Sequence, residues 1–247
     1  MHTCPKGTFP YIIQPYDTIW SLAHRFNTTA HEIKTLNPWV DLNCLPVGQV
    51  ICICPGYRPE CISRGELELS NHLRMLWEQH VVWTRLTVTS IAFDLPDVEF
   101  VINRLLRNPV DFEIAFRPFY GSQIASKLGV LLKNHLVIAV ELIKAAKAGD
   151  DKEAADAEKR WYANADAIAA LLGSINPYWS EEEWKSMLYE HLSLTKSETV
   201  NILNGNYEDG ISVYDEIEIQ ALKMADVMAE GIAKQFSYKF TKCFSCP

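Results

Sequence analysis

A short segment recurs three times in the C-terminal three quarters of this chain, and the recurrence limits the folds it can adopt. Each copy reads apolar, apolar, any, any, His, apolar, and its histidines, His80, His135 and His191, are almost evenly spaced. A turn sequence follows each histidine about four helical turns later, and a second alanine-containing segment follows the turn. A repeat of this length usually corresponds to one supersecondary unit. The sequence therefore predicts an all-α bundle of three tandem helical hairpins, about six helices, over residues 66–240.

The histidine of each copy is expected to point into the bundle, because it follows an apolar residue by four positions. The second segment of each copy carries an aspartate at a similar distance from the histidine: Asp111, Asp166 and Asp226. Buried imidazole nitrogens require partners, so three His–Asp hydrogen bonds that fix the helix register are one interpretation. A second is a metal-binding or redox site, in which the three histidines and these aspartates bind zinc or iron. The pattern leaves both open, together with a pocket of some other chemistry.

The seven cysteines lie near the two ends of the chain, and the long segment between Cys61 and Cys243 contains none. Disulfides are favoured over free thiols for such a clustered set. A zinc site is the other alternative, although no second pair near Cys52 and Cys54 has the spacing of a structural zinc site. The spacing does not give the disulfide connectivity.

The formal net charge is −8, and residues 1–62 contribute none of it. No basic stripe is present, so nucleic acid and anionic membranes are poor candidate partners. No uncharged apolar run is long enough to predict a membrane span, and the start of the chain lacks the apolar core of a cleaved signal peptide. Phosphate-binding loops, dinucleotide-binding glycine patterns and nucleophile elbows are also missing, so no catalytic residue is predicted and enzymatic activity stays uncertain.

Residues 9–54 predict an α+β module that precedes the bundle. Segments 9–14 and 47–53 are rich in β-forming residues. Between them, residues 19–26 carry apolar side chains at helical spacing, and the sequence that starts at Thr29 is a capping box for a second short helix. The predicted order is therefore strand, helix, helix, strand.

The N-terminal residues are similar to a known family. Tyr11-Ile-Ile-Gln-Pro-Tyr-Asp-Thr-Ile-Trp-Ser-Leu-Ala-His-Arg-Phe26, then Glu32-Ile33, Asn37-Pro38 and Leu45-Pro-Val-Gly-Gln-Val-Ile51, resemble a LysM domain. The resemblance implies a βααβ carbohydrate-binding module over residues 1–56 that binds peptidoglycan, chitin or another polymer of N-acetylglucosamine.

The same resemblance implies a shallow sugar groove between two loops. The groove residues that it implies are Asp17, Thr18, Ile19, Asn37, Pro38, Trp39 and Val40. Tyr16 departs from the family pattern, which usually has glycine before the Asp-Thr pair, and its side chain is expected to narrow the groove or add a stacking face. Trp20 and Phe26 are expected in the core of the module.

The helical region, over most of residues 70–240, resembles a family of uncharacterised bacterial helical proteins, which implies the helical fold and a bacterial source but no activity. The motifs are Leu76-Trp-Glu-Gln-His80, Arg104-Leu-Leu-Arg-Asn-Pro-Val-Asp111 and Arg160-Trp-Tyr-Ala-Asn-Ala-Asp166. The predicted organisation adds a linker at 57–65 and a cysteine-containing tail at 241–247. The resulting functional prediction is a non-catalytic protein of the cell wall or spore layers, otherwise cytoplasmic, whose LysM module anchors the bundle. Its alternative is the metal-binding or redox bundle, delivered to the wall by that module.

Overall fold

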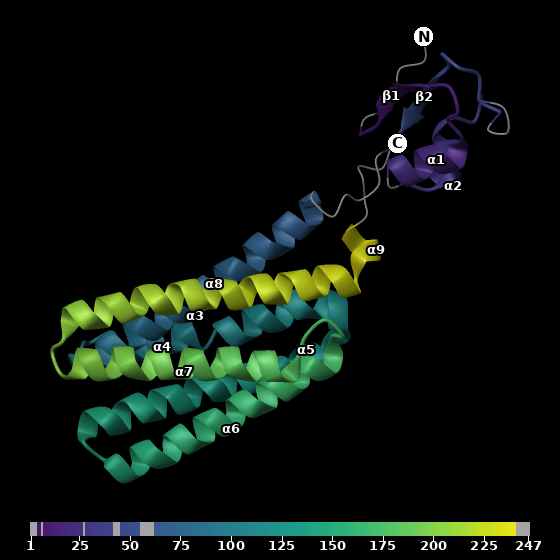
Figure 1. Ribbon diagram of the computed structural model, residues 1–247. Helices are drawn as coiled ribbons and strands as arrows, with labels where there is room; N and C mark the ends of the chain where they lie inside the picture. The colour runs from purple at the N-terminus through teal and green to yellow at the C-terminus, as the bar shows by residue number, and fades with distance from the viewer. Residues whose placement is uncertain (1–3, 6, 27, 42–44, 55–61, 241–247) are drawn as a thin grey trace. The chain divides into compact units, whose positions relative to one another are not determined.

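The computed structural model describes residues 4–5, 7–26, 28–41, 45–54 and 62–240 (Figure 1). The chain divides into two compact units, Met1–Leu67 with Ser237–Pro247, and Glu68–Phe236. Most of the predicted linker at 57–65 and the whole predicted tail at 241–247 lie outside the described residues, as do Cys44, Cys61, Cys243 and Cys246.

The smaller unit has the predicted strand–helix–helix–strand order. Strand β1 (Phe9–Ile12) pairs antiparallel with β2 (Val50–Ile53), so that Phe9 lies opposite Ile53 and Ile12 opposite Val50. Helices α1 (Ile19–Arg25) and α2 (Ala30–Leu36) connect the strands. Apolar side chains from all four elements form one core, whose most buried members are Ile13, Leu22, Ile33, Ile51 and Ile53.

Local sequence explains where the two short helices begin. The hydroxyl of Thr18 accepts a hydrogen bond from the backbone N–H of Ser21, whose side chain bonds back to the Thr18 backbone N–H. Thr29 and Glu32 form the same reciprocal arrangement at the start of α2, as the sequence predicts. Each box satisfies two of the backbone donors that a helix N-terminus leaves without partners.

A disulfide joins Cys4 to Cys52, with their Cα atoms 5.5 Å apart. It ties the start of the chain to strand β2 across a sequence separation of 48 residues. The prediction of disulfides is therefore confirmed for this pair, and Cys52 is not available as a thiolate ligand for zinc.

The rest of the described chain is helical, as predicted. Its helices are α3 (Arg64–Ala92), α4 (Val98–Leu105), α5 (Asn108–Ala148), α6 (Asp151–Ile175), α7 (Glu181–Leu203), α8 (Tyr207–Gln235) and α9 (Ser237–Phe240). Helix α5 contains Pro118 and is interrupted at Gly121, whose φ of 76° is not helical. The interruption divides α5 into two segments, so α3, the two parts of α5, α6, α7 and α8 supply the six main helices of the three predicted hairpins.

The predicted turns separate these helices. Gly149 ends α5 in the left-handed conformation, and the side chain of Asp150 then caps α6. Gly205, also left-handed (φ 77°), and Asn206 connect α7 to α8, but the Asn206 side chain forms no capping hydrogen bond. Figure 1 shows α5, α6, α7 and α8 running side by side, and α5 contacts α6, α6 contacts α7, and α7 contacts α8. The short helix α4, between α3 and α5, was not predicted.

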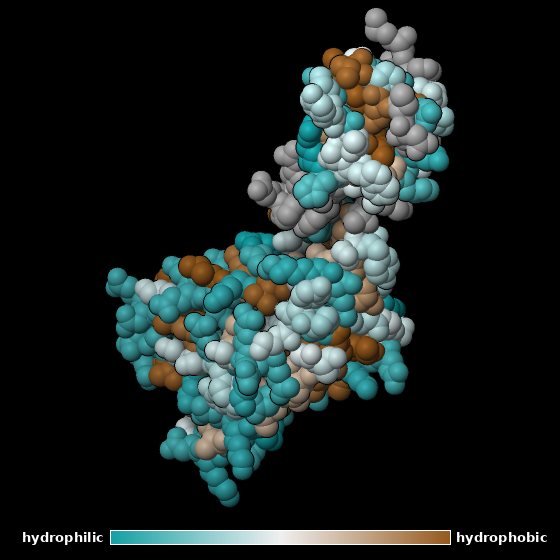
Figure 2. Space-filling view, turned by 45° about the vertical axis from the view of Figure 1, so that its right-hand side comes forward, coloured by the Kyte–Doolittle hydropathy of each residue, from teal (hydrophilic) through white to brown (hydrophobic). Residues whose placement is uncertain are grey.

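Exposed apolar residues of the helical unit are scattered among hydrophilic ones on the face seen in Figure 2. Within the described residues, none of the helices combines the length and hydropathy that crossing a membrane requires.

Candidate functional site

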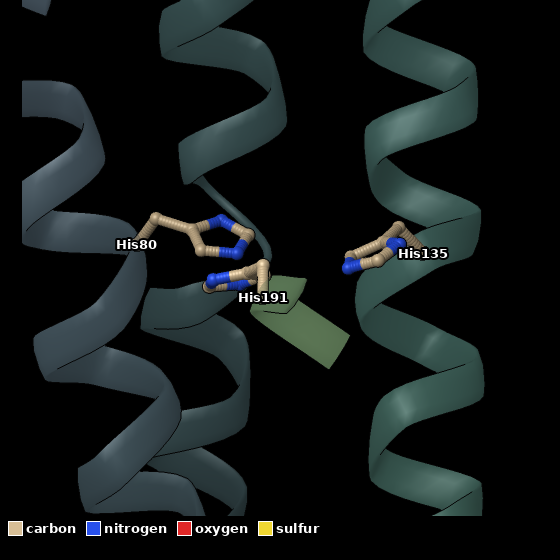
Figure 3. Close-up of side chains that lie close together, drawn as sticks. All are labelled: His80, His135 and His191. Atoms are coloured by element: carbon tan, nitrogen blue, oxygen red, sulfur yellow. The ribbon is translucent and has the colours of Figure 1, made fainter. Parts of the chain in front are cut away.

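The three histidines of the repeat meet inside the helical unit (Figure 3). His80 of α3, His135 of α5 and His191 of α7 are each at most 3% exposed. One ring nitrogen from each lies within 4.8 Å of the other two. The centroids of the imidazole rings are 5.5 to 6.5 Å apart. The inward orientation predicted for the repeated histidine therefore produces one cluster, which we call the histidine cluster.

Asparagines fix the first two imidazoles. Nδ1 of His80 lies 3.2 Å from Oδ1 of Asn108, and Nδ1 of His135 lies 3.1 Å from Oδ1 of Asn164. The amide nitrogen of each asparagine donates to a backbone carbonyl one turn before the histidine, at 2.9 and 3.1 Å. This donation leaves only the amide oxygen facing the ring, so Nδ1 must carry the proton and Nε2 keeps its lone pair.

The third copy places Gln220 at the equivalent position. Its Nε2 donates to the carbonyl oxygen of Met187, four positions before His191, at 2.8 Å. Among the described residues, neither Oε1 of Gln220 nor Nδ1 of His191 has a hydrogen-bond partner, although both atoms are buried. The third amide therefore lies where the asparagines lie, but its imidazole is not fixed by the same short contact.

The structure does not bring the predicted aspartates to the histidines. Each aspartate instead forms ion pairs with basic residues at the surface of the unit. These pairs are Asp111 with Arg107 at 3.3 Å, Asp166 with Lys185 at 2.8 Å and Asp226 with Arg74 at 2.6 Å. Amides, not carboxylates, are thus the hydrogen-bond partners of His80 and His135.

A signal for the amides was present in the sequence. Asn108, Asn164 and Gln220 are evenly spaced, and the interval between them is the period of the histidine repeat itself. The interval from Asp166 to Asp226 is longer than the interval from Asp111 to Asp166, so the spacing of the aspartates follows the repeat less closely.

Burial keeps the histidine cluster uncharged. It lowers the pKa of His80 to about 4 and that of His191 to about 3, and nearby His80 lowers the latter further. Burial and the two neighbouring imidazoles hold the pKa of His135 well below its usual range. All three rings are therefore neutral at pH 7 and each offers a lone pair.

Two tryptophans pack against the cluster. The ring of Trp77 lies 5.5 Å from His80 and 6.3 Å from His191, and the ring of Trp161 lies 5.3 Å from His135. Both indole N–H groups are buried and have no hydrogen-bond partner among the described residues. Trp161 also lines a cavity of about 220 Å³ between α5, α6 and α7.

A buried carboxylate lies further along α7. Glu198 is 1% exposed and forms an ion pair with Arg85 of α3, which also donates to the Gly210 carbonyl oxygen at 3.3 Å. The guanidinium stacks over the ring of Tyr214, 4.6 Å from its centroid. Burial raises the pKa of Glu198 to about 7, despite the opposing charge of Arg85.

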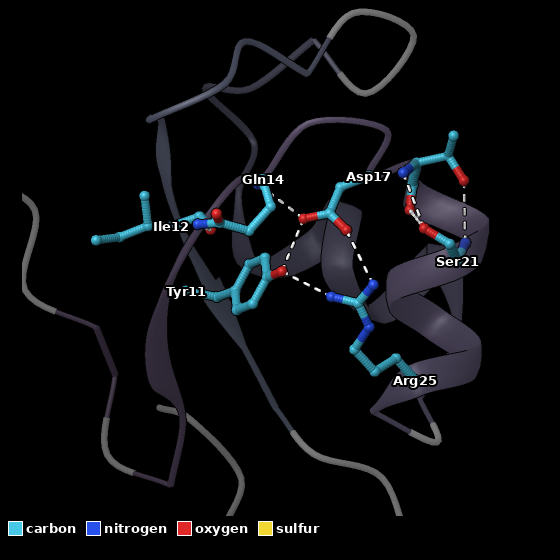
Figure 4. Close-up of polar contacts among 7 residues, drawn as sticks. Tyr11, Ile12, Gln14, Asp17, Ser21 and Arg25 are labelled. Carbon is cyan, nitrogen blue, oxygen red and sulfur yellow. Dashed lines mark hydrogen bonds and ion pairs between the residues drawn. The ribbon is translucent and has the colours of Figure 1, made fainter.

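In the smaller unit, hydrogen bonds and an ion pair hold the side chain of the predicted groove residue Asp17 (Figure 4). Its carboxylate accepts hydrogen bonds from the Tyr11 hydroxyl at 2.7 Å and the Gln14 backbone N–H at 2.8 Å, and Arg25 lies 3.2 Å away. The side chain is 2% exposed. Burial alone would raise the pKa of Asp17, but these hydrogen bonds and Arg25 hold it below its usual value. Asp17 therefore shapes the loop before α1 and offers little surface to a ligand.

Asn37, in the second predicted loop, is completely buried. Its amide nitrogen donates to the carbonyl oxygens of Ile33 and Cys52, and its Oδ1 accepts from the Cys52 backbone N–H, each at 2.7 Å. These bonds connect the end of α2 to strand β2. Asn37 is therefore also a positioning residue for its loop.

The remaining predicted groove residues divide by exposure. Thr18 and Pro38 are exposed and Trp39 is 46% exposed, whereas Ile19 and Val40 belong to the core. Trp20 is 74% exposed, so its prediction as a core residue is wrong. The buried face of α1 consists of Ile19, Leu22 and Ala23, and Trp20 lies off that face. Phe26 is partly buried and packs against the core as expected.

Comparison with known families decides the identity of this unit, because the LysM domain family matches residues 11–53. Residues 11–53 form a LysM domain. The match covers both strands except the first two residues of β1, both helices and the two loops of the predicted groove. The match ends at residue 53, so the resemblance of the helical unit to a bacterial family stays a prediction.

One curated relative is the secreted LysM effector Blys4 of Beauveria bassiana (strain ARSEF 2860). It is 42% identical over 50 residues, which are 20% of this chain and 29% of that protein. The chain thus shares with this relative a segment of LysM domain size and less than a third of the relative's length. No solved structure matches the chain significantly.

The LysM domain carries an unusual backbone conformation at Tyr16. This residue has a φ of 71°, in the left-handed region that favours glycine, and its side chain is 98% exposed. The conformation accounts for the glycine that the family usually has before the Asp-Thr pair. The exposed Tyr16 side chain gains no burial that would offset the strain of this conformation.

Proposed function

We propose that the LysM domain binds a polymer of N-acetylglucosamine, chitin or peptidoglycan, and so holds the helical unit on a cell wall or spore layer without catalysing a reaction. The observation that carries the proposal is the LysM match over residues 11–53. The relative named as a secreted LysM effector supports a role outside the cell.

The exposed residues of the two loops suit this ligand. An N-acetyl group needs hydrogen bonds to its amide and an apolar seat for its methyl group. The half-exposed Trp39 beside Pro38 offers an apolar surface, and the exposed Thr18 offers its hydroxyl proton, since its hydroxyl oxygen and backbone groups bond within α1. Asp17 and Asn37 have buried side chains, and their hydrogen bonds fix the shapes of the two loops.

Tyr16 adds a second aromatic surface next to the first loop. Because aromatic rings stack on the apolar faces of sugars, an exposed Tyr16 would extend the groove by one contact rather than close it. The proposed ligand contacts are therefore Tyr16, Thr18, Pro38 and Trp39, supported by backbone groups of the same loops.

Sedimentation with insoluble polymers tests the proposal. The full chain should pellet with chitin or peptidoglycan and stay in the supernatant with cellulose, which lacks N-acetyl groups. Trp39→Ala should weaken binding about tenfold, equivalent to about 1.4 kcal/mol, because it removes the apolar seat. Trp20→Ala is the matched control, since it removes an exposed tryptophan outside the predicted groove and should bind like the wild type. Wild-type protein that stays in the supernatant with both glycans would contradict the proposal.

A further inference from the structure

We propose that the histidine cluster is a zinc-binding site, in which His80, His135 and His191 each supply one ring nitrogen and the fourth position takes water or an anion. This inference goes beyond glycan binding and concerns the helical unit alone. The three ligands come from three different helices, each the first helix of its hairpin.

The geometry is close to that of a three-histidine site. Zinc binds imidazole nitrogen at about 2.0–2.1 Å, so nitrogens in tetrahedral positions are about 3.4 Å apart. The nitrogens here lie within 4.8 Å of one another. Each must therefore move by less than about 1 Å toward a common centre.

The amides prepare the nitrogens for a metal. Asn108 and Asn164 each accept a hydrogen bond from the Nδ1–H group of their histidine. This bond fixes the tautomer and leaves Nε2 as the lone-pair donor. Each asparagine is itself fixed by a backbone carbonyl, so the ring orientation is set by two consecutive hydrogen bonds. Such outer partners are the usual means by which proteins orient metal-binding histidines.

A purely structural hydrogen-bond network explains the arrangement less well. In a buried network every donor and acceptor should be satisfied, because an unpaired polar atom costs about 1–3 kcal/mol. In the described part of the chain, the bond with asparagine is the only hydrogen bond that the ring of His80 or His135 forms, and Nδ1 of His191 faces the Gln220 amide without a short contact. The Nε2 lone pairs of His80 and His135 thus lie close to a ring nitrogen of His191, and a cation would satisfy the three nitrogens together.

The donor set selects zinc over iron. Non-haem iron sites usually combine two histidines with a carboxylate. Within the described residues, the potential ligand group contains three histidines and no carboxylate, and the predicted aspartates pair with basic residues elsewhere. Three neutral imidazoles and an open fourth position are a set that zinc accepts.

The surroundings suit a fourth ligand that accepts hydrogen bonds. Three neutral ligands leave the two positive charges of zinc uncompensated in a buried site, which favours hydroxide or another anion. Trp77 and Trp161, which pack on the cluster, carry the unpaired indole N–H donors. The cavity beside Trp161 begins one helical turn beyond His135 and His191, at Ala139 and Thr195, and offers space for a small anion to approach.

Cobalt substitution tests the site in the full chain. The protein is treated with a chelator, its free thiols are blocked with iodoacetamide, and Co²⁺ is added as a spectroscopic probe. We expect about one equivalent of Co²⁺ with the intense visible absorption of four-coordinate cobalt, displaced by one equivalent of Zn²⁺. Elemental analysis after gel filtration gives the stoichiometry independently. Less than about 0.1 equivalent of either metal in folded wild-type protein would overturn the proposal.

Matched histidine variants assign the ligands. His135→Ala should abolish the visible band, whereas His72→Ala should retain it, because His72 is an exposed residue on α3, eight positions before His80. If His135→Ala does not fold, as judged by circular dichroism, His135→Gln replaces it with a side chain of similar volume. Equal metal loss in the His72 and His135 variants would overturn the assignment.

Asn164→Leu tests the positioning role of the amide. It leaves all three histidines in place but removes the acceptor for Nδ1 of His135, so zinc affinity should fall about 10–100-fold. Affinity is measured by competition with a zinc chelator in folded protein. An unchanged affinity would show that the amide does not prepare this imidazole for metal.

Discussion

Lowering the pH should destabilise the metal-free helical unit, and the structure sets the size of the effect. The histidine cluster has depressed pKa values in the folded state, so unfolding near pH 5 takes up nearly three protons. Glu198 has the opposite sign, because its folded pKa of about 7 lies above its unfolded value and unfolding releases its proton in the same pH range. Glu78, whose pKa is raised by burial and by Glu218, makes a smaller contribution of the same sign as Glu198.

The net uptake is therefore about two protons. Stability should fall by about 2.7 kcal/mol for each pH unit between about pH 5.5 and 4.5, since one proton corresponds to about 1.36 kcal/mol per unit. The histidine contribution is fully present above pH 6.5 and is lost as the pH falls toward the folded pKa values. With a urea dependence of about 2 kcal/mol per molar, the midpoint should fall by about 1.3 M per pH unit.

Urea titrations followed by far-ultraviolet circular dichroism measure this slope, because most of the helical signal comes from the larger unit. A chelator is present throughout, so that the metal-free state is followed. Glu198→Gln is the matched variant: it removes the opposing proton and should steepen the slope to about 4 kcal/mol per pH unit. A wild-type slope below about 1.4 kcal/mol per pH unit, which corresponds to one proton, would refute the reasoning. An unchanged slope in Glu198→Gln would refute it as well.

Three further substitutions test other contacts. Gly231→Ala should destabilise the helical unit by about 1–3 kcal/mol or more, because a Cβ there would lie 1.9 Å from the Trp179 indole nitrogen; thermal unfolding at neutral pH measures the loss. Asn37→Ala should destabilise the LysM domain by about 3 kcal/mol, because it removes three hydrogen bonds, two of them to Cys52. The rate of hydrogen exchange at the Cys52 amide should rise accordingly, and an unchanged rate would contradict the role given to Asn37. Tyr16→Gly should stabilise the same domain by about 1 kcal/mol, because glycine adopts the positive φ without strain, and it should weaken glycan binding. A destabilised variant would contradict the conclusion that Tyr16 is strained.

The sequence was most informative where local chemistry determines structure. The capping box at Thr29, the turn glycine Gly149 and the inward position of the repeated histidine all follow from rules that act over a few residues. The same rules would have placed Trp20 outside, because it lies off the face formed by Ile19 and Leu22. Its size suggested the core, and helical spacing was the better guide.

Partners that are far apart in the sequence were harder to predict. Asn37 contacts Cys52, 15 residues away, and no local pattern marks an asparagine in a loop as buried. The sequence predicts aspartates beside the histidines because one recurs at a similar distance in each copy. The asparagines that hold these positions, Asn108 and Asn164, lie one full repeat apart. In a repeated sequence, the residues that keep the period are the better candidates for a shared site.

The three histidines come from three successive hairpins, and this order has a consequence for synthesis on the ribosome. The hairpins of His80 and His135 emerge first and can pack locally, because each pairs with the segment that directly follows it. Their imidazoles have no third neighbour until the hairpin of His191 has been made. A chain that is released early, before α7, would therefore bury two histidines at most and could not assemble the cluster. The cluster would thus distinguish chains that include α7 from those that end before it.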